Sequence, residues 1–184
     1  MSVIVLGVQT PVTSEPKIFT IGKGEVLMAK IIVVDPEKCG ACHICEMICS
    51  LVKEGECNPA KSRIRIIRGV MMETPLVCQQ CEVLFCASVC QKNAIKRDET
   101  TNATVADWEL CNGCKACIKA CPYQAISYDA RRKKVFICDH CGGNPQCVNW
   151  CPTGALEYLD VTESSREKQI VGDEKVLSLL NKIR

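Results

Sequence analysis

The sequence contains no long hydrophobic run. No apolar stretch approaches the ~20 residues that a membrane-spanning helix requires, so we expect no direct membrane span. The first residues also lack an arginine-rich segment followed by an apolar stretch, so no secretory or twin-arginine signal is visible. These two absences predict a cytoplasmic location.

Aromatic residues and net charge are also low. Phe, Trp and Tyr make up 4% of the 184 residues, and the formal net charge is +2. A nearly neutral chain is not drawn to nucleic acid or to a membrane surface by its overall field. Two basic runs, residues 61–68 and 131–134, carry no interleaved aromatic residues for base stacking. We therefore predict no nucleic-acid partner and interpret the runs as solvated faces, with docking of an acidic partner as the alternative.

Cysteine, by contrast, is abundant. Of the 17 cysteines, sixteen fall into four groups with nearly the same spacing. The groups are Cys39-Cys42-Cys45-Cys49, Cys78-Cys81-Cys86-Cys90, Cys111-Cys114-Cys117-Cys121 and Cys138-Cys141-Cys147-Cys151. The first and third read C-x2-C-x2-C-x3-C, and the middle gap grows to four residues in the second group and to five in the fourth. This spacing is the one by which bacterial-type ferredoxins hold iron–sulfur cubanes.

The spacing suits the chemistry of such a cluster, because each corner needs a thiolate. Three thiolates come from one short loop, whose amide N–H groups turn toward the cluster sulfides. The fourth cysteine lies on the first turn of a short helix and, in two-cluster ferredoxins, ligates the other cluster. Pro122 and Pro152 follow the third and fourth groups, as in the ferredoxin run, whereas Ser50 and Gln91 take that place in the first and second. We expect this departure to change the local turn and not the ligation.

Two other uses of cysteine are weaker interpretations. Zinc sites usually draw four thiolates from two separated pairs, whereas each group here has four cysteines of its own. Disulfides are rare where thiols stay reduced. His43 and His140 lie between cysteines and are interpreted as spacers that face the loop, since each group already has four thiolates. Cys57 lies outside the groups and is predicted to be a free, partly buried thiol.

A core of ordinary hydrophobic side chains would be thin for this length. The hydrophobic fraction of 47% includes the 17 cysteines, so we expect the fold to need cross-links from metal clusters or disulfides. Trp108 and Trp150 stand beside cysteine groups, where they either shield a cluster from water or pack in the core.

Short β-rich segments flank the cysteine groups. They are residues 31–34, 62–67, 94–96, 104–106, 126–128, 135–137 and 156–159. Residues 94–106 and 126–137 predict two hairpins, and residues 55–69 and 71–76 are expected to separate the first two groups. Short strands around a pair of groups, with a short helix inside each group, describe a two-cluster ferredoxin, and the chain repeats this unit. The sequence therefore predicts an α+β fold of two fused bacterial 2[4Fe-4S] ferredoxin-like units with short strands, short helices and long loops.

Three parts are expected along the chain. Residues 1–29 contain no cysteine and form an N-terminal extension, either an arm that packs on a partner or a segment ahead of a true start at Met28. Residues 30–160 form the four-cluster domain, and residues 161–184 form a C-terminal tail. In that tail, Val176, Leu179, Leu180 and Ile183 fall at helical spacing. The stripe predicts a helix packed on its own domain, with packing on a partner as the alternative.

Four stretches carry a resemblance to a known family. They are CGACHICEMICS, CQQCEVLFCASVC, CNGCKACIKACPYQAI and CDHCGGNPQCVNWCPTGAL. Through them, residues 30–160 resemble the four-cluster ferredoxin-type electron-transfer subunits of molybdenum- and tungsten-dependent oxidoreductases. That family includes the iron–sulfur subunits of dimethyl sulfoxide reductase, formate dehydrogenase and hydrogenase complexes. It also includes the ferredoxin-like subunits that accompany aldehyde ferredoxin oxidoreductases, class II benzoyl-CoA reductase and carbon monoxide dehydrogenase.

The resemblance implies four [4Fe-4S] clusters. It pairs groups one and four as an outer pair and groups two and three as an inner pair. The implied ligand sets are Cys39, Cys42, Cys45 and Cys151 for cluster 1; Cys138, Cys141, Cys147 and Cys49 for cluster 2; Cys78, Cys81, Cys86 and Cys121 for cluster 3; and Cys111, Cys114, Cys117 and Cys90 for cluster 4.

The function that follows is electron transfer rather than catalysis. We see no nucleotide-binding glycine motif, no flavin site and no vacant metal position, so no catalytic residue is predicted. The chain is expected to relay single electrons between a catalytic subunit, a tungsten or molybdenum pterin enzyme, and a further redox subunit or soluble ferredoxin. The alternatives are a subunit of a carbon monoxide dehydrogenase or hydrogenase complex, a free-standing polyferredoxin and a zinc-stabilised interaction module.

Overall fold

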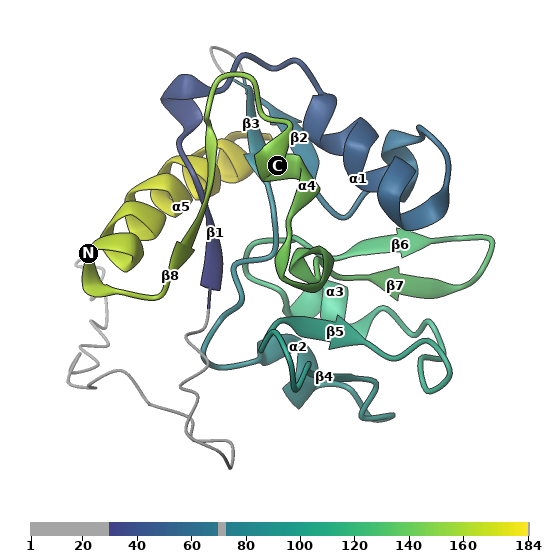
Figure 1. The fold of residues 1–184 in the computed structure, drawn as a ribbon. Helices are drawn as coiled ribbons and strands as arrows, with labels where there is room; N and C mark the ends of the chain where they lie inside the picture. The colour runs from purple at the N-terminus through teal and green to yellow at the C-terminus, as the bar shows by residue number, and fades with distance from the viewer. Residues whose placement is uncertain (1–29, 70–72, 184) are drawn as a thin grey trace, which may run out of the picture.

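The computed structural model describes residues 30–69 and 73–183, which form a small α+β fold of short elements, as predicted (Figure 1). The strands are β1 (Lys30–Val34), β2 (Arg65–Arg68), β3 (Glu73–Leu76), β4 (Ile95–Arg97), β5 (Thr104–Ala106), β6 (Ser127–Asp129), β7 (Lys134–Phe136) and β8 (Leu156–Asp160). The α-helices are α1 (Ile44–Glu54), α2 (Phe85–Ser88), α3 (Ala116–Ala120), α4 (Gln146–Asn149) and α5 (Glu163–Ile183), with 3-10 helices at Pro36–Lys38, Pro59–Lys61 and His140–Gly143. The predicted N-terminal extension, with Met28, lies outside the described residues.

The strands pair two by two in antiparallel sheets. Both predicted hairpins are confirmed, since β4 pairs with β5 and β6 pairs with β7. The pair β1–β8 joins distant parts of the chain and sets Val34 opposite Leu156. As a result, the segment that leads into the first cysteine group lies beside the segment that leaves the fourth (Figure 1).

The pair β2–β3 differs from the prediction. The separator expected over residues 71–76 contains a strand, in which Pro75 pairs opposite Ile66. A proline has no N–H to donate and argues against an interior strand, but an edge strand of a two-stranded sheet tolerates it. The predicted strand over residues 62–67 begins only at Arg65, because the Ser62 hydroxyl bonds both the carbonyl and the amide of Ile64.

Each of the helices α1 to α4 begins inside one cysteine group, directly before that group's third cysteine. The third cysteine of each group therefore lies in a helix. Helix α1 packs against α4, and α2 packs against α3. The helices thus associate in the nested order, outer with outer and inner with inner.

The residue after the fourth cysteine changes the local turn, as expected. Ser50 replaces proline and lets α1 continue past Cys49 to Glu54, where Gly55 ends the helix at a φ of 73°. Three residues after the fourth cysteine of the other groups, the chain turns through a left-handed residue, namely Asn93, Gln124 or Gly154. Gln91 therefore allows the same turn as the two prolines, whereas serine extends the helix.

The C-terminal stripe packs on its own domain. Helix α5 contacts β1, and Val176 and Leu179 are buried (Figure 1). Val176 joins Leu76 and Ala125 in a small hydrophobic cluster, while the larger clusters of the core include cysteines among their buried members. No helix in residues 30–69 or 73–183 is long and apolar enough to cross a membrane.

Helix α5 approaches β1 most closely at Gly172. A Cβ atom at this position would lie 2.4 Å from the carbonyl oxygen of Val34. Alanine in a helix interior normally stabilises by roughly 0.5–1 kcal/mol relative to glycine, but this contact would force the helix off the strand. We expect Gly172→Ala to lower the midpoint of thermal unfolding, measured anaerobically by circular dichroism. Ser178→Ala, on the exposed side of the same helix, should leave the midpoint unchanged or slightly raised, and a similar result for Gly172→Ala would contradict the close approach.

Candidate metal centres

Two cavities are each lined by four cysteines. The first, called site 1, is lined by Cys39, Cys42, Cys45 and Cys151. The second, called site 4, is lined by Cys90, Cys111, Cys114 and Cys117. In each cavity three cysteines come from one loop, and the fourth comes from the fourth position of a distant group.

The other eight cysteines also lie near one another, although Cys138 and Cys147 each also neighbour a cysteine of another set, Cys78 and Cys45 respectively. Cys138 lies near Cys147 and Cys49, and Cys147 lies near Cys49 and Cys141. Cys78 lies near Cys81, Cys86 and Cys121. We call the set Cys138, Cys141, Cys147 and Cys49 site 2, and the set Cys78, Cys81, Cys86 and Cys121 site 3.

A bare set of thiolates would be unfavourable in these places. Burial, together with the charge of neighbouring cysteines, raises the pKa of Cys78 to about 12 and that of Cys138 well above its usual range. Crowded thiolates repel one another, and burial makes each thiolate unfavourable. Iron bound among them offsets both the repulsion and the burial, because iron binds cysteine as the thiolate. The donor set of sulfur alone is the one that iron–sulfur clusters take. The residues therefore fit the cluster chemistry.

The backbone of all four loops shares one unusual feature. The residue directly before the second cysteine has a positive φ in every group: 51° at Ala41, 49° at Gln80, 72° at Gly113 and 54° at His140. A residue in this region is uncommon unless it is glycine. Alternating right- and left-handed residues turn successive N–H groups into one concavity, a nest that binds anions, including many iron–sulfur centres. Groups one and three have a second left-handed residue two positions on, at His43 and Lys115, whereas in group four the residues from His140 to Gly143 are left-handed in succession. The loops of groups one and three thus fit a negatively charged centre most clearly.

Hydrogen bonds reach three of the fourth-position cysteines as well. The amides of Arg63 and Ala94 donate to Cys49 Sγ and Cys90 Sγ, each at 3.3 Å. Burial raises the pKa of Cys151, but hydrogen bonds from the Thr153 hydroxyl and nearby backbone amides outweigh it and lower that pKa overall. Donors of this kind stabilise a thiolate and help to set the potential of a cluster that it ligates.

The four sites lie in a row. Cys45 of site 1 is a neighbour of Cys147 in site 2, and Cys138 of site 2 is a neighbour of Cys78 in site 3. Cys86 of site 3 is in turn a neighbour of Cys117 in site 4. Among the sixteen cysteines of the four sites, Cys42 and Cys114 are the exposed ones. Sites 1 and 4, to which these two belong, are therefore the ends of the row.

The two histidines between the cysteines behave differently. His43 is half-buried, and its ring nitrogens face carboxylates outside its own loop: Nδ1 lies 2.6 Å from Glu46 Oε2 in α1, and Nε2 lies 3.5 Å from Glu73 Oε2 in β3. His140 is instead fully buried, packed edge-on against Tyr158 with ring centroids 5.2 Å apart. Burial lowers the pKa of His140 to about 4, and neither ring nitrogen has a hydrogen-bond partner among the described residues. The interpretation as a loop-facing spacer is therefore wrong for His140, because its ring fills the interior.

One other prediction needs correction, and one alternative is excluded. Cys57 is exposed rather than partly buried, because its neighbours Glu56 and Asn58 are polar and offer no apolar surface to cover it. Trp150 is 60% exposed and does not pack in the core. Trp108 does pack, since its indole N–H donates to the Val135 carbonyl at 3.0 Å and its ring contacts Phe136.

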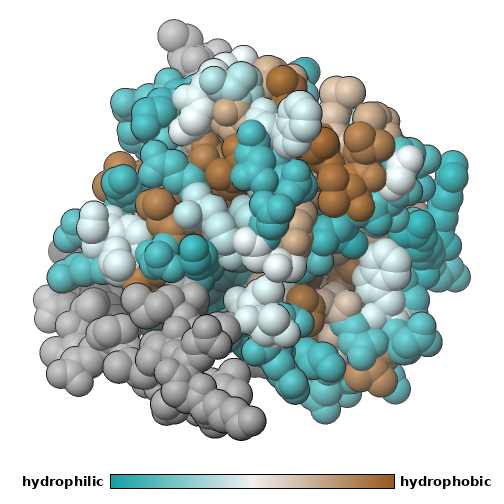
Figure 2. Space-filling model, in the orientation of Figure 1, coloured by the Kyte–Doolittle hydropathy of each residue, from teal (hydrophilic) through white to brown (hydrophobic). Residues whose placement is uncertain are grey.

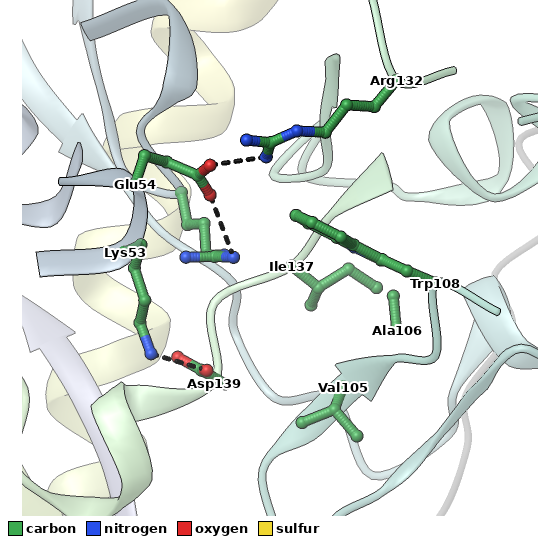
Figure 3. Close-up of a pocket in the computed structure, with 9 residues that line it drawn as sticks. Lys53, Glu54, Val105, Ala106, Trp108, Arg132, Ile137 and Asp139 are labelled. Carbon is green, nitrogen blue, oxygen red and sulfur yellow. Dashed lines mark hydrogen bonds and ion pairs between the residues drawn. The ribbon is translucent and has the colours of Figure 1, made fainter. Parts of the chain in front are cut away.

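A separate cavity of about 460 Å³ holds none of the cysteines (Figure 3). It lies between the end of α1 and the segment around Trp108, and ion pairs line it. Lys53 Nζ is 2.7 Å from Asp139 Oδ2, and the Glu54 carboxylate pairs with both Arg63 and Arg132. These side chains pair as ions, although Glu54 Oε1 and Arg63 Nη1 have no hydrogen-bond partner among the described residues. We interpret the cavity as the charged seam between the outer and inner halves and not as a substrate pocket.

The sequence reasoning missed Gln80. Its side chain is buried and donates from Nε2 to the Cys138 carbonyl at 2.8 Å, which ties the loop of group two to the loop of group four. A polar residue beside a cysteine gives no signal of such a bond, because the partner is 58 positions away.

Comparison with known proteins places this geometry among iron–sulfur proteins. Residues 70–161 match the family model described as a 4Fe-4S dicluster domain. The chain is 42% identical over 133 residues to a protein of Pyrococcus furiosus named as the polyferredoxin-like subunit of an aliphatic sulfonate oxidoreductase, covering 71% of this chain and 76% of that protein. It is 35% identical over 153 residues to the putative electron transport protein YsaA of Escherichia coli, covering 77% of this chain and 96% of that protein.

Among solved structures, the active-site complex BamBC of benzoyl-coenzyme A reductase aligns with 82% of this chain and 89% of its own, at 25% identity. The TM-score is 0.44, which is too low to support an argument about fold or function.

The loop of site 4 depends on Gly113. This residue has a φ of 72°, and a Cβ atom on it would lie 2.1 Å from the Lys133 carbonyl oxygen. We expect Gly113→Ala to displace the loop and to lower the iron content by about four atoms per chain, the content of one cubane. Gly142→Ala is the matched control, because its φ is 68° but no atom lies within 4 Å of the added carbon. Iron analysis and electron paramagnetic resonance measure the difference; equal iron in the two variants would contradict the steric role of Gly113.

Proposed function

This chain belongs to the 4Fe-4S dicluster domain family as an iron–sulfur electron-transfer subunit of oxidoreductase complexes, and we propose that it carries four [4Fe-4S] clusters in a row. Each cluster, when bound, accepts and passes on a single electron. The protein supplies the thiolates, the amide donors around them and the spacing between sites. The observation that carries the proposal is the gathering of sixteen cysteines into four sets of four.

We propose that sites 1 to 4 bind clusters 1 to 4, with the ligand sets given above. Two fused ferredoxin-like units then result, because in each set three cysteines of one group are completed by the fourth cysteine of its partner group. The packing of α1 on α4 and of α2 on α3 supports this pairing, since those helices carry the shared cysteines or lead into them. Sites 1 and 2 form the outer unit, and sites 3 and 4 form the inner unit.

Electrons then travel along the row between sites 1 and 4. Cys42 and Cys114 are exposed at the two ends, which supports entry and exit there, whereas Cys138 and Cys147 are buried in the middle. An electron that enters at one end has to pass the junction between sites 2 and 3 to reach the other. Cysteines that have to stay reduced to bind clusters suit a reducing compartment, and we propose that the protein works in the cytoplasm.

The partner we propose is a catalytic oxidoreductase subunit, with a tungsten or molybdenum pterin enzyme as the specific class that the motifs resemble. A further redox subunit or a soluble ferredoxin would serve the other end. The name of the Pyrococcus furiosus relative supports an oxidoreductase partner. Exposed apolar side chains near the sites support a bound subunit: Met47 and Leu51 are 45% and 43% exposed on one side of α1, where Figure 2 shows hydrophobic surface, and Val83 is 63% exposed.

Pairs of cysteine variants test the ligand sets. Anaerobically purified wild-type protein should be brown and contain about sixteen irons per chain. Because Cys42 and Cys151 belong to one site, the double variant Cys42→Ser/Cys151→Ser should disturb no more clusters than either single variant. Cys42→Ser/Cys147→Ser should disturb two clusters, and Cys57→Ser should disturb none. Iron analysis and electron paramagnetic resonance are the measurements; a colourless zinc protein, or the opposite pattern of additivity, would refute the proposal.

The size of the native species tests the bound-subunit role. On size-exclusion chromatography of anaerobic native extract, the chain should comigrate with a larger subunit and with tungsten or molybdenum. Nickel in that peak would indicate a carbon monoxide dehydrogenase or hydrogenase partner instead. A lone peak near 20.3 kDa would show that the protein is a free-standing polyferredoxin.

A further inference from the structure

The side chain of Arg97 is anchored at the junction between sites 2 and 3. Arg97 ends β4, and its guanidinium reaches into the loop of the second cysteine group. Its Nη2 donates to the carbonyl oxygens of Cys81 and Gln80 at 2.5 and 3.3 Å. Its Nη1 donates to Gln80 Oε1 and Thr104 Oγ1, each at 3.2 Å, and to the Asn102 carbonyl at 3.0 Å. Five acceptors thus fix the position of the charge.

No carboxylate within residues 30–69 or 73–183 forms an ion pair with this guanidinium. All of its acceptors are neutral, and the side chain is half-buried. A partly desolvated cation without a counter-charge is unfavourable. The charged or chargeable groups near it are the site 3 cysteines Cys78, Cys81 and Cys86 and a second cation, Arg166. Negative charge in site 3 would therefore be the nearest counter-charge for Arg97.

The same side chain supports the contact between the two halves. Gln80, which accepts from Arg97 through both its side-chain and backbone oxygens, donates to the carbonyl of Cys138 in site 2. The amide of Thr104 also donates to Gln80 Oε1, at 2.6 Å. Arg97 is thus tied to the loop of site 3 directly and to the loop of site 2 through one residue.

We propose that Arg97 raises the reduction potential of the cluster in site 3, so that an electron on the row rests in the inner unit rather than passing evenly along it. The inference rests on the proposed function, since it requires a cluster in site 3. Its physical basis is that reduction adds one negative charge to the cluster. A fixed cation that is hydrogen-bonded to the ligand loop stabilises the reduced form more than the oxidised form. Arg97 also holds the carbonyls of Gln80 and Cys81 by hydrogen bonds within the loop that would surround the cluster.

Three variants separate charge from structure. Arg97→Gln removes the charge but keeps hydrogen-bonding groups, and Arg97→Lys keeps the charge but loses the planar fork. Lys96→Gln is the matched control, because Lys96 is exposed on the other side of the same strand and its loss changes the net charge equally. The readout is an anaerobic redox titration followed by electron paramagnetic resonance, with the site 3 signal identified by its change in Cys78→Ser.

We expect Arg97→Gln to disfavour reduction of site 3 by about tenfold, a fall of about 59 mV for one electron. Arg97→Lys should stay near the wild-type potential, and Lys96→Gln should match wild type. The inference is overturned if Arg97→Gln leaves the potential unchanged, or if Lys96→Gln shifts it equally. Should Arg97→Gln lose the site 3 cluster, the Arg97→Lys variant decides the question. If this variant, which keeps the positive charge, also loses the site 3 signal as Cys78→Ser does, Arg97 is only structural. Wild-type protein without four clusters would instead refute the proposed function, and the two failures are therefore distinct.

Discussion

The fold depends on one requirement, which is that sulfur atoms from distant parts of the chain meet in sets of four. Cys151 reaches the loop of Cys39 only because β8 returns alongside β1 and α4 packs on α1. The hydrophobic side chains other than cysteine form small clusters, and we do not expect these clusters alone to hold the four sets of cysteines together. The two larger hydrophobic clusters count Cys45, Cys138 and Cys117 among their buried members, so the core is built partly from the proposed ligands. We therefore expect binding of iron and folding to be coupled in this protein.

The backbone of the loops shows the same coupling. Ala41, Gln80 and His140 hold a left-handed conformation that costs of order 1–3 kcal/mol for a residue other than glycine. Such a conformation persists only where surrounding interactions fix it. In these loops it directs amide groups inward, toward the place where a negatively charged cluster is favourable. Strain in the loop and affinity for the cluster thus have the same origin.

The junction between the halves contains polar connections as well as the buried side chain of Val77, which joins the outer hydrophobic cluster. Gln80 and the carbonyl of Cys138 form one connection, and the ion pair of Glu54 with Arg132 forms another. Two half-buried arginines, Arg63 and Arg97, lie at this junction, but only Arg63 has a carboxylate partner among the described residues. The junction therefore links the two halves and places positive charge beside the middle of the proposed electron path.

The sequence by itself determined the chemistry, the two hairpins and the terminal helix, because cysteine spacing, alternating residues and an apolar stripe are local signals. It did not reveal β3, since Pro75 conceals an edge strand, or the burial of His140, since its neighbours in sequence are ligands on a loop. The bond from Gln80 to Cys138 and the position of Arg97 were decided only by the tertiary structure. Such contacts join residues that are far apart in the chain, and a side chain's polarity does not state which distant carbonyl or thiol it will face. The order of the four sites and the position of Arg97 beside their middle were likewise decided only by the tertiary structure.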